Sequence, residues 1–280
     1  MNVAVLGMGV MGRAMAANIA RAGLHTAVWN RRRDRADPLA GEGARVSGSV
    51  AEAVRDAEVV ITMVTDADAV LGIAEEMLPA MRVGATWAQM STIGVDGIER
   101  AAQLVDRRRP DVTLVDAPVS GSRGPAEKGE LTVLASGPQA ARERLRPVFD
   151  AVGTRTVWVG EAGQGTRLKL VTNTLLAFQA QGLAESLGLA AKLGVDLPVV
   201  LGALDGSPLV SAWARLKLER IAHDDYSDEF SLALATKDLD LAVAQVPLPV
   251  APHIRDLWRQ AVGAGLGDYD LTVITRELRS

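Results

Sequence analysis

The chain of 280 residues contains no cysteine. This absence excludes disulfide bonds, thiolate nucleophiles and cysteine-ligated metals, and it is consistent with a reducing compartment. Histidine is also scarce, because His25, His223 and His253 are far apart in the sequence and have no carboxylates at ligand spacing. We therefore predict that the protein has no metal site.

Long hydrophobic runs and an excess of one charge are missing as well. No apolar stretch reaches the roughly 20 residues that a membrane-spanning helix needs. The first apolar run begins at Val3 with no charged segment before it, so we expect no signal peptide. The formal net charge is −4, so no overall field attracts nucleic acid or an anionic membrane. With 48% hydrophobic and 23% charged residues, the composition is that of a globular protein, which we expect to be soluble and cytoplasmic.

In the first 160 residues, short runs rich in β-branched side chains alternate with longer helical patterns. The runs expected to form strands are 2–6, 26–29, 59–64, 86–89, 113–116, 131–135 and 156–159. Helical patterns lie between most of them, for example at 10–22, 49–55 and 95–107. This alternation predicts βαβ units with right-handed crossovers, and therefore an α/β fold with a mainly parallel, doubly wound Rossmann sheet.

The pattern changes after a glycine-rich turn at residues 160–165. From Thr166 to Leu193 there is no proline and no convincing strand, so we predict one helix about 40 Å long. The rest of the chain shows helical patterns broken by turns. We expect a dinucleotide-binding domain over residues 1–162 and an all-helical domain over residues 163–280, joined by this helix.

The clearest motif follows the first predicted strand directly. It is a G-x-G-x-x-G sequence, made of Gly7, Met8, Gly9, Val10, Met11 and Gly12, and a helix-forming segment comes after it. Strand, tight turn and helix N-terminus are the context in which this motif binds a dinucleotide. The first glycine permits the turn, the second lets the backbone approach the pyrophosphate, and the third lets helix and strand pack closely. The phosphates would lie at the positive end of the helix dipole.

The second predicted strand ends in Trp29-Asn30-Arg31-Arg32-Arg33, with Asn30 eighteen residues after Gly12. Sites that prefer NAD usually have Asp or Glu here, which accepts hydrogen bonds from the ribose 2′-OH. This chain has Asn30 and then arginines, whose guanidinium groups can bind a 2′-phosphate that a carboxylate would repel. The sequence therefore favours NADP(H), bound by Asn30, Arg31 and Arg32. NAD(H) stays open as the alternative, since Asp34 could reach the ribose.

Five segments together resemble the β-hydroxyacid dehydrogenases, a family that includes 3-hydroxyisobutyrate dehydrogenase and the glyoxylate/succinic semialdehyde reductases. They are residues 7–18 (GMGVMGRAMAAN), 116–131 (DAPVSGSRGPAEKGEL), 160–173 (GEAGQGTRLKLVTN), 237–241 (KDLDL) and 267–270 (GDYD). The resemblance spans nearly the whole chain. It implies an NAD(P)-dependent dehydrogenase or reductase that acts on a small hydroxyacid or aldehyde acid.

The third segment carries the family's lysine and asparagine in register, as Lys169 and Asn173. They are four residues apart in the predicted long helix, so their side chains share a face. An ammonium group can stabilise the negative charge on a carbonyl oxygen that receives a hydride, and can then donate the proton. We predict Lys169 as general acid/base and Asn173 as the residue that orients the substrate or the lysine. The alternative is a surface lysine on a helix, which we expect for Lys192 and Lys217.

The resemblance also implies the residues that surround the substrate and the nicotinamide. Ser120, Gly121 and Ser122 form the family's substrate loop, where exposed N–H groups and hydroxyls could hold a carboxylate. The serine at 122, where the family often has glycine, is closer to the glyoxylate/succinic semialdehyde reductases. The other implied residues are Met63, Val64, Thr65 and Lys237 for the cofactor, Phe230 and Asp238 for the substrate, and Thr92 for both.

Two other functions remain open from the sequence. One is imine reduction, since imine reductases share the predicted architecture and the Asn-Arg pair, although they generally lack the family lysine. The other is a catalytically silent NADP-binding scaffold, which would need neither Lys169 nor Asn173. We also expect dimerisation, because the long helix carries small residues that permit close helix approach, at positions 177, 180, 182, 184, 188 and 190. The family resemblance implies a homodimer or a homotetramer built on this domain.

Overall fold

The structure is a computed structural model that describes residues 1–279. These residues divide into two compact units, and the division falls between Lys169 and Leu170. It lies inside one long helix, α7 (Gln164–Lys192), which begins in the first unit and continues into the second. Each unit has a hydrophobic core of its own.

The first unit is built on a six-stranded sheet in which all neighbouring strands are parallel. Its order is β3 (Arg45–Val46), β2 (His25–Trp29), β1 (Asn2–Leu6), β4 (Val59–Thr62), β5 (Thr86–Gln89) and β6 (Thr113–Asp116). This arrangement confirms the predicted Rossmann fold. The chain moves outward from β1 to β3 and then returns to β4 on the other side of β1. The order therefore reverses between β1 and β4, the place where ligands bind in such sheets.

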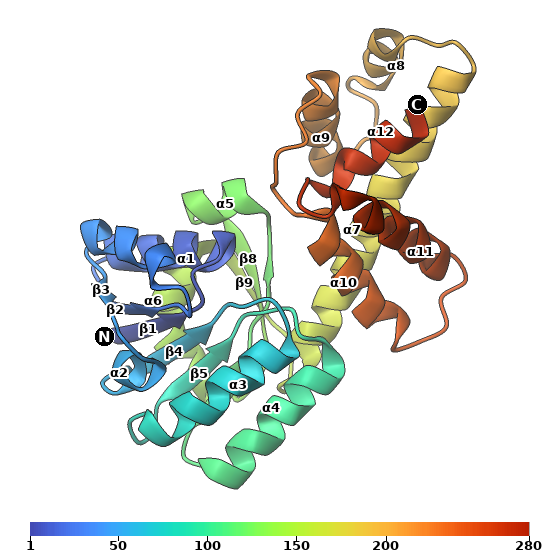
Figure 1. The fold of residues 1–280 in the computed structure, drawn as a ribbon. Helices are drawn as coiled ribbons and strands as arrows, with labels where there is room; N and C mark the ends of the chain where they lie inside the picture. The colour runs from blue at the N-terminus through green and yellow to red at the C-terminus, as the bar shows by residue number, and fades with distance from the viewer. Residues whose placement is uncertain (280) are drawn as a thin grey trace. The chain divides into compact units, whose positions relative to one another are not determined.

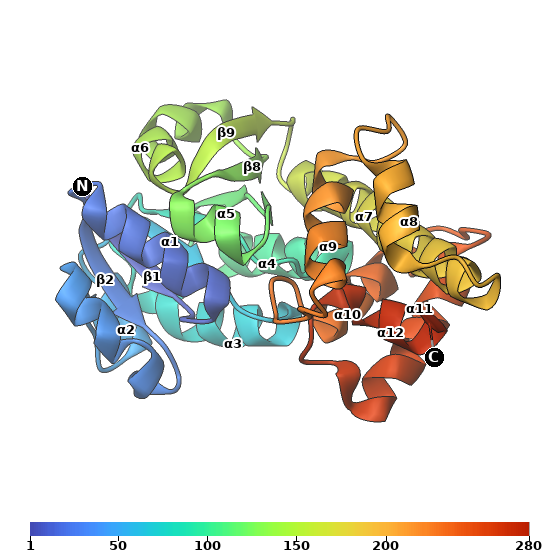
Figure 2. The same cartoon turned by 90° about the horizontal axis from the view of Figure 1, so that it is seen from above.

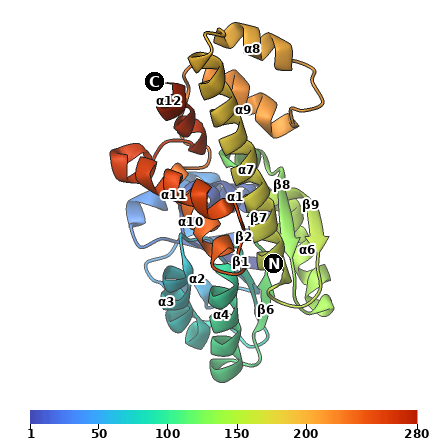
Figure 3. The same cartoon turned by 90° about the vertical axis from the view of Figure 1, so that its right-hand side faces the viewer.

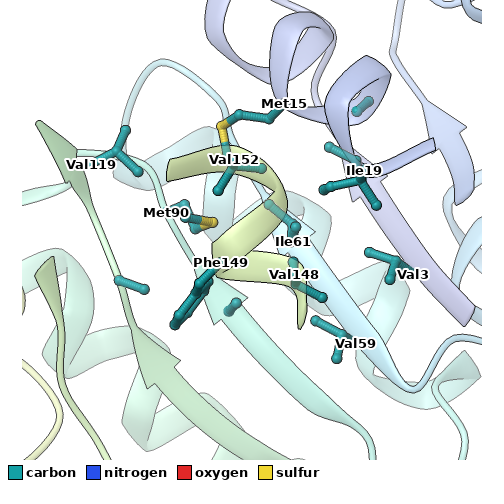
Figure 4. Packing of buried hydrophobic residues seen from close by; sticks show 14 of the residues in the cluster. Val3, Met15, Ile19, Val59, Ile61, Met90, Val119, Val148, Phe149 and Val152 are labelled. Carbon is teal, nitrogen blue, oxygen red and sulfur yellow. The ribbon is translucent and has the colours of Figure 1, made fainter. Parts of the chain in front are cut away.

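Helices cover both faces of this sheet (Figure 1). On one face lie α1 (Val10–Arg21) and α6 (Arg142–Val152), and on the other α2 (Val50–Val54), α3 (Ala67–Met77) and α4 (Gly94–Arg108). Alternate side chains of β1 serve the two cores, because successive residues of a strand point to opposite faces. Val3 and Val5 belong to one cluster, while Ala4 and Leu6 belong to the other. Figure 4 shows Met15 of α1 and Phe149 of α6 in the first cluster.

The last strands of the first unit form a separate three-stranded sheet. Its order is β7 (Val119–Ser120), β8 (Leu131–Ala135) and β9 (Gly153–Trp158), with β7 antiparallel and β9 parallel to β8. An antiparallel bridge between Asp116 and Ser136 joins this sheet to β6. The helix α5 (Arg123–Lys128) connects β7 to β8 and lies beside α1 (Figure 2), where Asn18 Nδ2 donates a 2.8 Å hydrogen bond to the carbonyl of Ala126.

The second unit is helical, as predicted. After α7 come α8 (Leu197–Leu204), α9 (Ala212–Ala222), α10 (Leu232–Val243), α11 (Ala251–Ala261) and α12 (Ile274–Arg279). In Figure 3, α10, α11 and α12 pack around α7, and the core between them includes Ala177, Ala180 and Ala184 of α7. Buried Trp258 of α11 donates a 2.9 Å hydrogen bond from Nε1 to Gln181. Within residues 1–279, no helix combines the length and the apolar character that crossing a membrane requires.

Candidate active site

The glycine loop between β1 and α1 has the shape that a dinucleotide requires. Gly7 has a φ of +105°, and a Cβ there or at Gly12 would collide with backbone oxygen atoms. Both positions therefore require glycine. The colliding oxygens belong to the backbone of the loop itself and of the neighbouring strand end, so they cannot move aside as a side chain could. At Gly9 nothing lies within 4 Å of a Cβ position, so the space above the loop is open.

Gly9 is also the N-cap residue of α1, and no side chain makes a cap hydrogen bond there. The first amides of this helix are therefore not capped by a side chain, and they lie at the positive end of the helix dipole. Open space above Gly9 and an uncapped helix N-terminus together fit a pyrophosphate group. On these observations the loop fits the cofactor that the sequence predicts.

Asn30 holds the glycine loop against the end of β2. Its Oδ1 accepts a 2.9 Å hydrogen bond from the Met8 amide, and its Nδ2 donates a 2.7 Å bond to the carbonyl of Arg32. Both ends of the Asn30 amide are therefore engaged within the protein. Arg31 and Arg32 follow with exposed side chains, whereas Arg33 forms a 3.2 Å ion pair with Asp37. Arg33 is exposed as well, but Asp37 engages it, so Arg31 and Arg32 are the better candidates for binding a ligand at this strand end.

A buried polar network fixes the loops that follow β4 and β5. The Ser91 hydroxyl accepts a 2.8 Å hydrogen bond from the Val64 amide. Gln89 bonds both the amide and the carbonyl of Ser91, each at 2.8 Å, and Trp87 donates a 2.9 Å bond to Thr62 Oγ1. This network holds in place two predicted cofactor segments, residues 63–65 and Thr92.

Thr62, Trp87, Gln89 and Ser91 of this network were not among the predicted site residues, whereas Val64 was. Gln89 is fully buried in a parallel strand, and Thr62 and Ser91 are buried beside it. A signal was present, because a buried polar side chain must find partners inside the protein. Gln89 between the apolar neighbours Ala88 and Met90 could have been identified as such a residue.

The predicted substrate loop lies between β7 and α5. Gly121 has a φ of +133°, and a Cβ there would lie 2.6 Å from Leu131 Cδ2, so the loop requires glycine at this position. Ser120 and Ser122 on either side are half-buried. Ser122 is the N-cap residue of α5 but makes no side-chain cap hydrogen bond with it.

The beginning of α7 is held by a buried carboxylate that the sequence reasoning had not assigned. Asp116, at the carboxyl end of β6, accepts 2.7 Å hydrogen bonds from the amide and the hydroxyl of Thr166. Burial raises the pKa of the Asp116 carboxyl, while the hydrogen bonds from Thr166 and Ser136 act in the opposite direction. Lys169 is buried one helical turn further along α7 and is the last residue of the first unit.

In the second unit, the structure brings Asn173, Lys237 and Asp238 together. Asn173 Nδ2 donates a 2.6 Å hydrogen bond to Asp238 Oδ2, and Lys237 Nζ lies 2.9 Å from Asp238 Oδ1. Because the amide nitrogen of Asn173 is engaged by Asp238, its Oδ1 remains as the acceptor end of that side chain. Phe230 is half-buried just before α10, and its amide donates a 3.3 Å hydrogen bond to Asp270.

Lys217 differs from its prediction. We expected a surface lysine on a helix, but the structure buries Lys217 and pairs its Nζ with Asp270 Oδ2 at 2.7 Å. The prediction was wrong because the partner lies 53 positions further along the chain. Lys192 is exposed at the end of α7, as expected.

Two family models match this chain, and together they cover almost all of it. The NAD-binding domain of 6-phosphogluconate dehydrogenase matches residues 2–160. The NAD-binding domain of NADP-dependent 3-hydroxyisobutyrate dehydrogenase matches residues 163–278.

Individual relatives agree with these models. Glyoxylate/succinic semialdehyde reductase 1 of Arabidopsis thaliana is 31% identical over 100% of this chain and 99% of its own length. The human cytokine-like nuclear factor N-PAC is 29% identical, but the alignment covers 51% of that protein and 98% of this one.

Among solved structures, 3-hydroxyisobutyrate dehydrogenase of Mycobacterium tuberculosis with L-serine has a TM-score of 0.89 and 29% identity, covering 100% of this chain and 99% of that one. An imine reductase of Myxococcus stipitatus has a TM-score of 0.71 and 22% identity over 99% of each chain, which shows a shared fold. The chain therefore belongs, as its motifs predicted, to the β-hydroxyacid dehydrogenase family of NAD(P)-binding oxidoreductases that act on CH–OH groups.

Proposed function

We propose that this enzyme transfers a hydride between NADP(H) and a small hydroxyacid or aldehyde acid, with Lys169 as the general acid/base. The observation that carries the proposal is the burial of Lys169 one turn after the helix start that Asp116 holds at the edge of the sheet. Burial keeps the ammonium group out of bulk water, where its charge acts more strongly on an oxygen that becomes negative during the reaction. The family membership supplies the reaction type.

When bound, the nicotinamide supplies or accepts the hydride. In the reductive direction, the Lys169 ammonium hydrogen-bonds to the substrate carbonyl oxygen and stabilises the negative charge that develops there. Its Nζ then gives that oxygen a proton, which yields the hydroxyl group and a neutral amine. In the oxidative direction, the neutral amine takes the hydroxyl proton. Asn173, whose Nδ2 is engaged by Asp238 at 2.6 Å, offers its Oδ1 to orient a donor on the substrate or on the lysine.

Replacing Lys169 with Ala tests this role. We expect turnover to fall by at least about 10²-fold, the lower range for lost acid–base catalysis, while the cofactor still binds. Lys192→Ala is the matched control, because Lys192 is an exposed lysine on the same helix. Undiminished turnover in Lys169→Ala would contradict the proposal. If only cyclic-imine reduction persisted, the enzyme would be an imine reductase. If no variant, the wild type included, turned over any substrate, it would be a cofactor-binding scaffold.

The preference for NADP(H) rests on the end of β2. Arg31 and Arg32 are exposed there, and Asn30 is engaged by Met8 and Arg32, so no carboxylate at position 30 repels a 2′-phosphate. We expect Arg31→Ala and Arg32→Ala to weaken NADPH binding by about tenfold each, as for loss of one charge-assisted hydrogen bond, and to leave NADH binding nearly unchanged. Arg33→Ala is the control, because Arg33 pairs with Asp37. Fluorescence titration of both cofactors measures the effect, and equal losses for NADH and NADPH would argue against the preference.

The loop around Gly121 and the relatives support the proposed substrate class. Ser120 and Ser122 flank this glycine with half-buried side chains, which supports binding of a carboxylate through hydroxyl and N–H donors. The named relatives reduce glyoxylate and succinic semialdehyde or act on 3-hydroxyisobutyrate. A panel of these compounds, methylmalonate semialdehyde and a cyclic imine, followed by absorbance of the reduced nicotinamide, identifies the substrate. Activity on neutral aldehydes equal to that on aldehyde acids would contradict the carboxylate requirement.

We also propose that α7 forms an interface with a second copy of the chain. Three of the small residues that suggested this, Ala177, Ala180 and Ala184, are instead buried in the core of the second unit, whereas Gly182 is exposed. The opposite face of α7 carries an exposed apolar stripe, consisting of Val171, Leu175, Phe178 and Leu189. These positions fall within one face of a helix with 3.6 residues per turn. Exposed apolar surface of this kind commonly marks a protein interface.

The oligomeric state tests the stripe. We expect a dimer or tetramer by light scattering after size-exclusion chromatography, and a smaller species for Leu175→Glu. Val83→Glu is the control, because Val83 is 80% exposed, belongs to the first unit and is not part of α7. A monomeric wild type, or an unchanged assembly in Leu175→Glu, would refute the interface.

A further inference from the structure

The helix α7 begins without an acidic residue of its own in its first turn. Its leading amides are nevertheless all engaged within residues 1–169. The amides of Gln164 and Arg167 bond to backbone carbonyls at 3.2 and 3.1 Å. The amide of Gly165 bonds to Ser136 Oγ at 2.9 Å, and the amide of Thr166 bonds to Asp116 Oδ2 at 2.7 Å. The two side chains that complete this helix start therefore come from β6 and from the end of β8.

Asp116 makes this attachment specific. Its side chain has no exposed surface, and both carboxylate oxygens accept hydrogen bonds, from Thr166 on Oδ1 and Oδ2 and from Ser136 on Oδ2 at 3.2 Å. A Cβ at Gly165 would collide with the carbonyl oxygen of Leu134, so the first turn of α7 is pressed directly against the strand. A carboxylate at this place also interacts favourably with the positive end of the helix dipole.

This attachment fixes the rotation of α7 about its own axis. Each residue advances an α-helix by about 100°, so residues three or four apart share a face. Lys169 is three residues after Thr166 and four after Gly165, and it is buried on the same side of the helix. A change in the contact between Asp116 and Thr166 therefore changes the direction in which the Lys169 side chain leaves the helix.

We propose that Asp116 is the positioning residue of this active site, because its buried carboxylate clamps Thr166 and so sets the orientation of Lys169. Asp116 acts through α7 and exchanges no proton with the substrate. The proposal rests on the proposed function, in which Lys169 is the general acid/base.

Asp116→Asn replaces one acceptor oxygen by an NH₂ donor. Three groups donate hydrogen bonds to this carboxylate: the amide and the hydroxyl of Thr166 and the hydroxyl of Ser136. In the variant, the NH₂ group faces at least one of these donors and cannot accept its hydrogen bond. We expect kcat to fall about 10²-fold, the size of effect that a 1 Å misplacement of a catalytic group produces. The dissociation constant for NADPH should change less than twofold, since Asp116 does not belong to the glycine loop. Asp106→Asn, at an exposed aspartate near the end of α4, is the control.

Variants of Thr166 test the same contact if Asp116→Asn does not fold. Thr166→Ser keeps the hydroxyl donor and should retain near wild-type kcat. Thr166→Val removes the hydroxyl that bonds to Asp116 Oδ1 at 2.7 Å and should lower kcat with NADPH binding unchanged. Equal kcat values for the Ser and Val variants would overturn the proposal, as would an unaltered kcat in a folded Asp116→Asn enzyme.

The double variant Asp116→Asn/Lys169→Ala separates this inference from the proposed function. If Asp116 acts only through Lys169, its substitution lowers the residual turnover of Lys169→Ala less than twofold. A full loss in that background would mean a general structural role and would overturn the inference alone. If Lys169→Ala by itself left turnover intact, the proposed function would fail first, independently of Asp116.

Discussion

The ammonium group of Lys217 lies 2.7 Å from the carboxylate of Asp270, and both side chains are almost completely buried. Asp270 also accepts hydrogen bonds from the hydroxyl of Thr272 at 2.7 Å and from the amide of Phe230 at 3.3 Å. The pair thus ties α9 to the segment before α12 and fixes the backbone beside a predicted substrate residue. The GDYD motif near the chain end has a structural reason in this contact.

Breaking this pair should strongly destabilise the second unit. Lys217→Met leaves Asp270 buried with Arg220 as its other cation, at 4.0 Å, and loss of one partner of a buried ion pair costs about 3–5 kcal/mol. Urea unfolding monitored by tryptophan fluorescence measures the loss. Lys217→Met/Asp270→Asn should regain part of the stability, because no buried charge is left unpaired. Lys192→Met is the control, because Lys192 is exposed, and it should leave the urea unfolding curve unchanged.

Substitutions at two glycines of the dinucleotide loop should affect stability and cofactor binding differently. Gly12→Ala forces a Cβ against the carbonyl of Gly7, and overpacking of this kind costs about 1–3 kcal/mol. Gly9→Ala meets no protein atom within 4 Å, so its stability should stay within about 0.5 kcal/mol of wild type. The added methyl group occupies the place of the phosphates, and we expect NADPH binding to weaken at least tenfold. Gly9→Ala with wild-type affinity would contradict the placement of the cofactor.

The network around Ser91 should link stability to cofactor binding. Ser91→Ala removes the acceptor of the Val64 amide at 2.8 Å, and a buried donor without a partner costs about 1–3 kcal/mol. Because the affected loop contains Met63 and Thr65, we expect the KM for the cofactor to rise while kcat changes little. Thermal unfolding and initial-rate kinetics test both effects. Ser49→Ala is the control, since Ser49 caps α2 and is exposed there.

The pH dependence of stability should reveal the pair formed by Arg220 and Asp225. Hydrogen bonds from Arg220, and then from Ser227, hold the pKa of Asp225 well below its usual value. A lowered folded-state pKa means that the stabilisation is present above the unfolded-state pKa of about 3.9 and is lost as the pH falls toward the folded-state pKa. We expect Asp225→Asn to lower the melting temperature by the same small amount from pH 7 down to about pH 4, with the difference shrinking below that. Solvent screens the half-exposed pair, so the effect should not exceed about 1 kcal/mol.

A pH-independent difference between the wild type and Asp225→Asn would show that the charge of Asp225 does not contribute. Asp224→Asn is a suitable comparison, because Asp224 is an exposed neighbour in the same turn. It should show no such dependence on pH.

Much of the fold could be predicted from local patterns in the sequence. The strands β1, β5, β6 and β8 have the predicted bounds, since hydrophobic runs of four or five residues between turns are visible in the sequence itself. The two-residue strands β3 and β7 were not predicted, because so short a segment has no periodicity. The division of the strands into two sheets also went unpredicted, since no local pattern shows that β8 pairs with β7 and β9 instead of extending the six-stranded sheet.

The amino-acid sequence alone determined the glycine loop, the βαβ order and the family, because each of these depends on residue types at fixed short spacing. Only the tertiary structure decided which residues hold the start of α7, which ion pair lies inside the second unit and which face of α7 is exposed. Contacts such as that of Asp116 with Thr166 join residues fifty positions apart. Their geometry follows from the packing of whole strands and helices, and no local pattern of side chains encodes it.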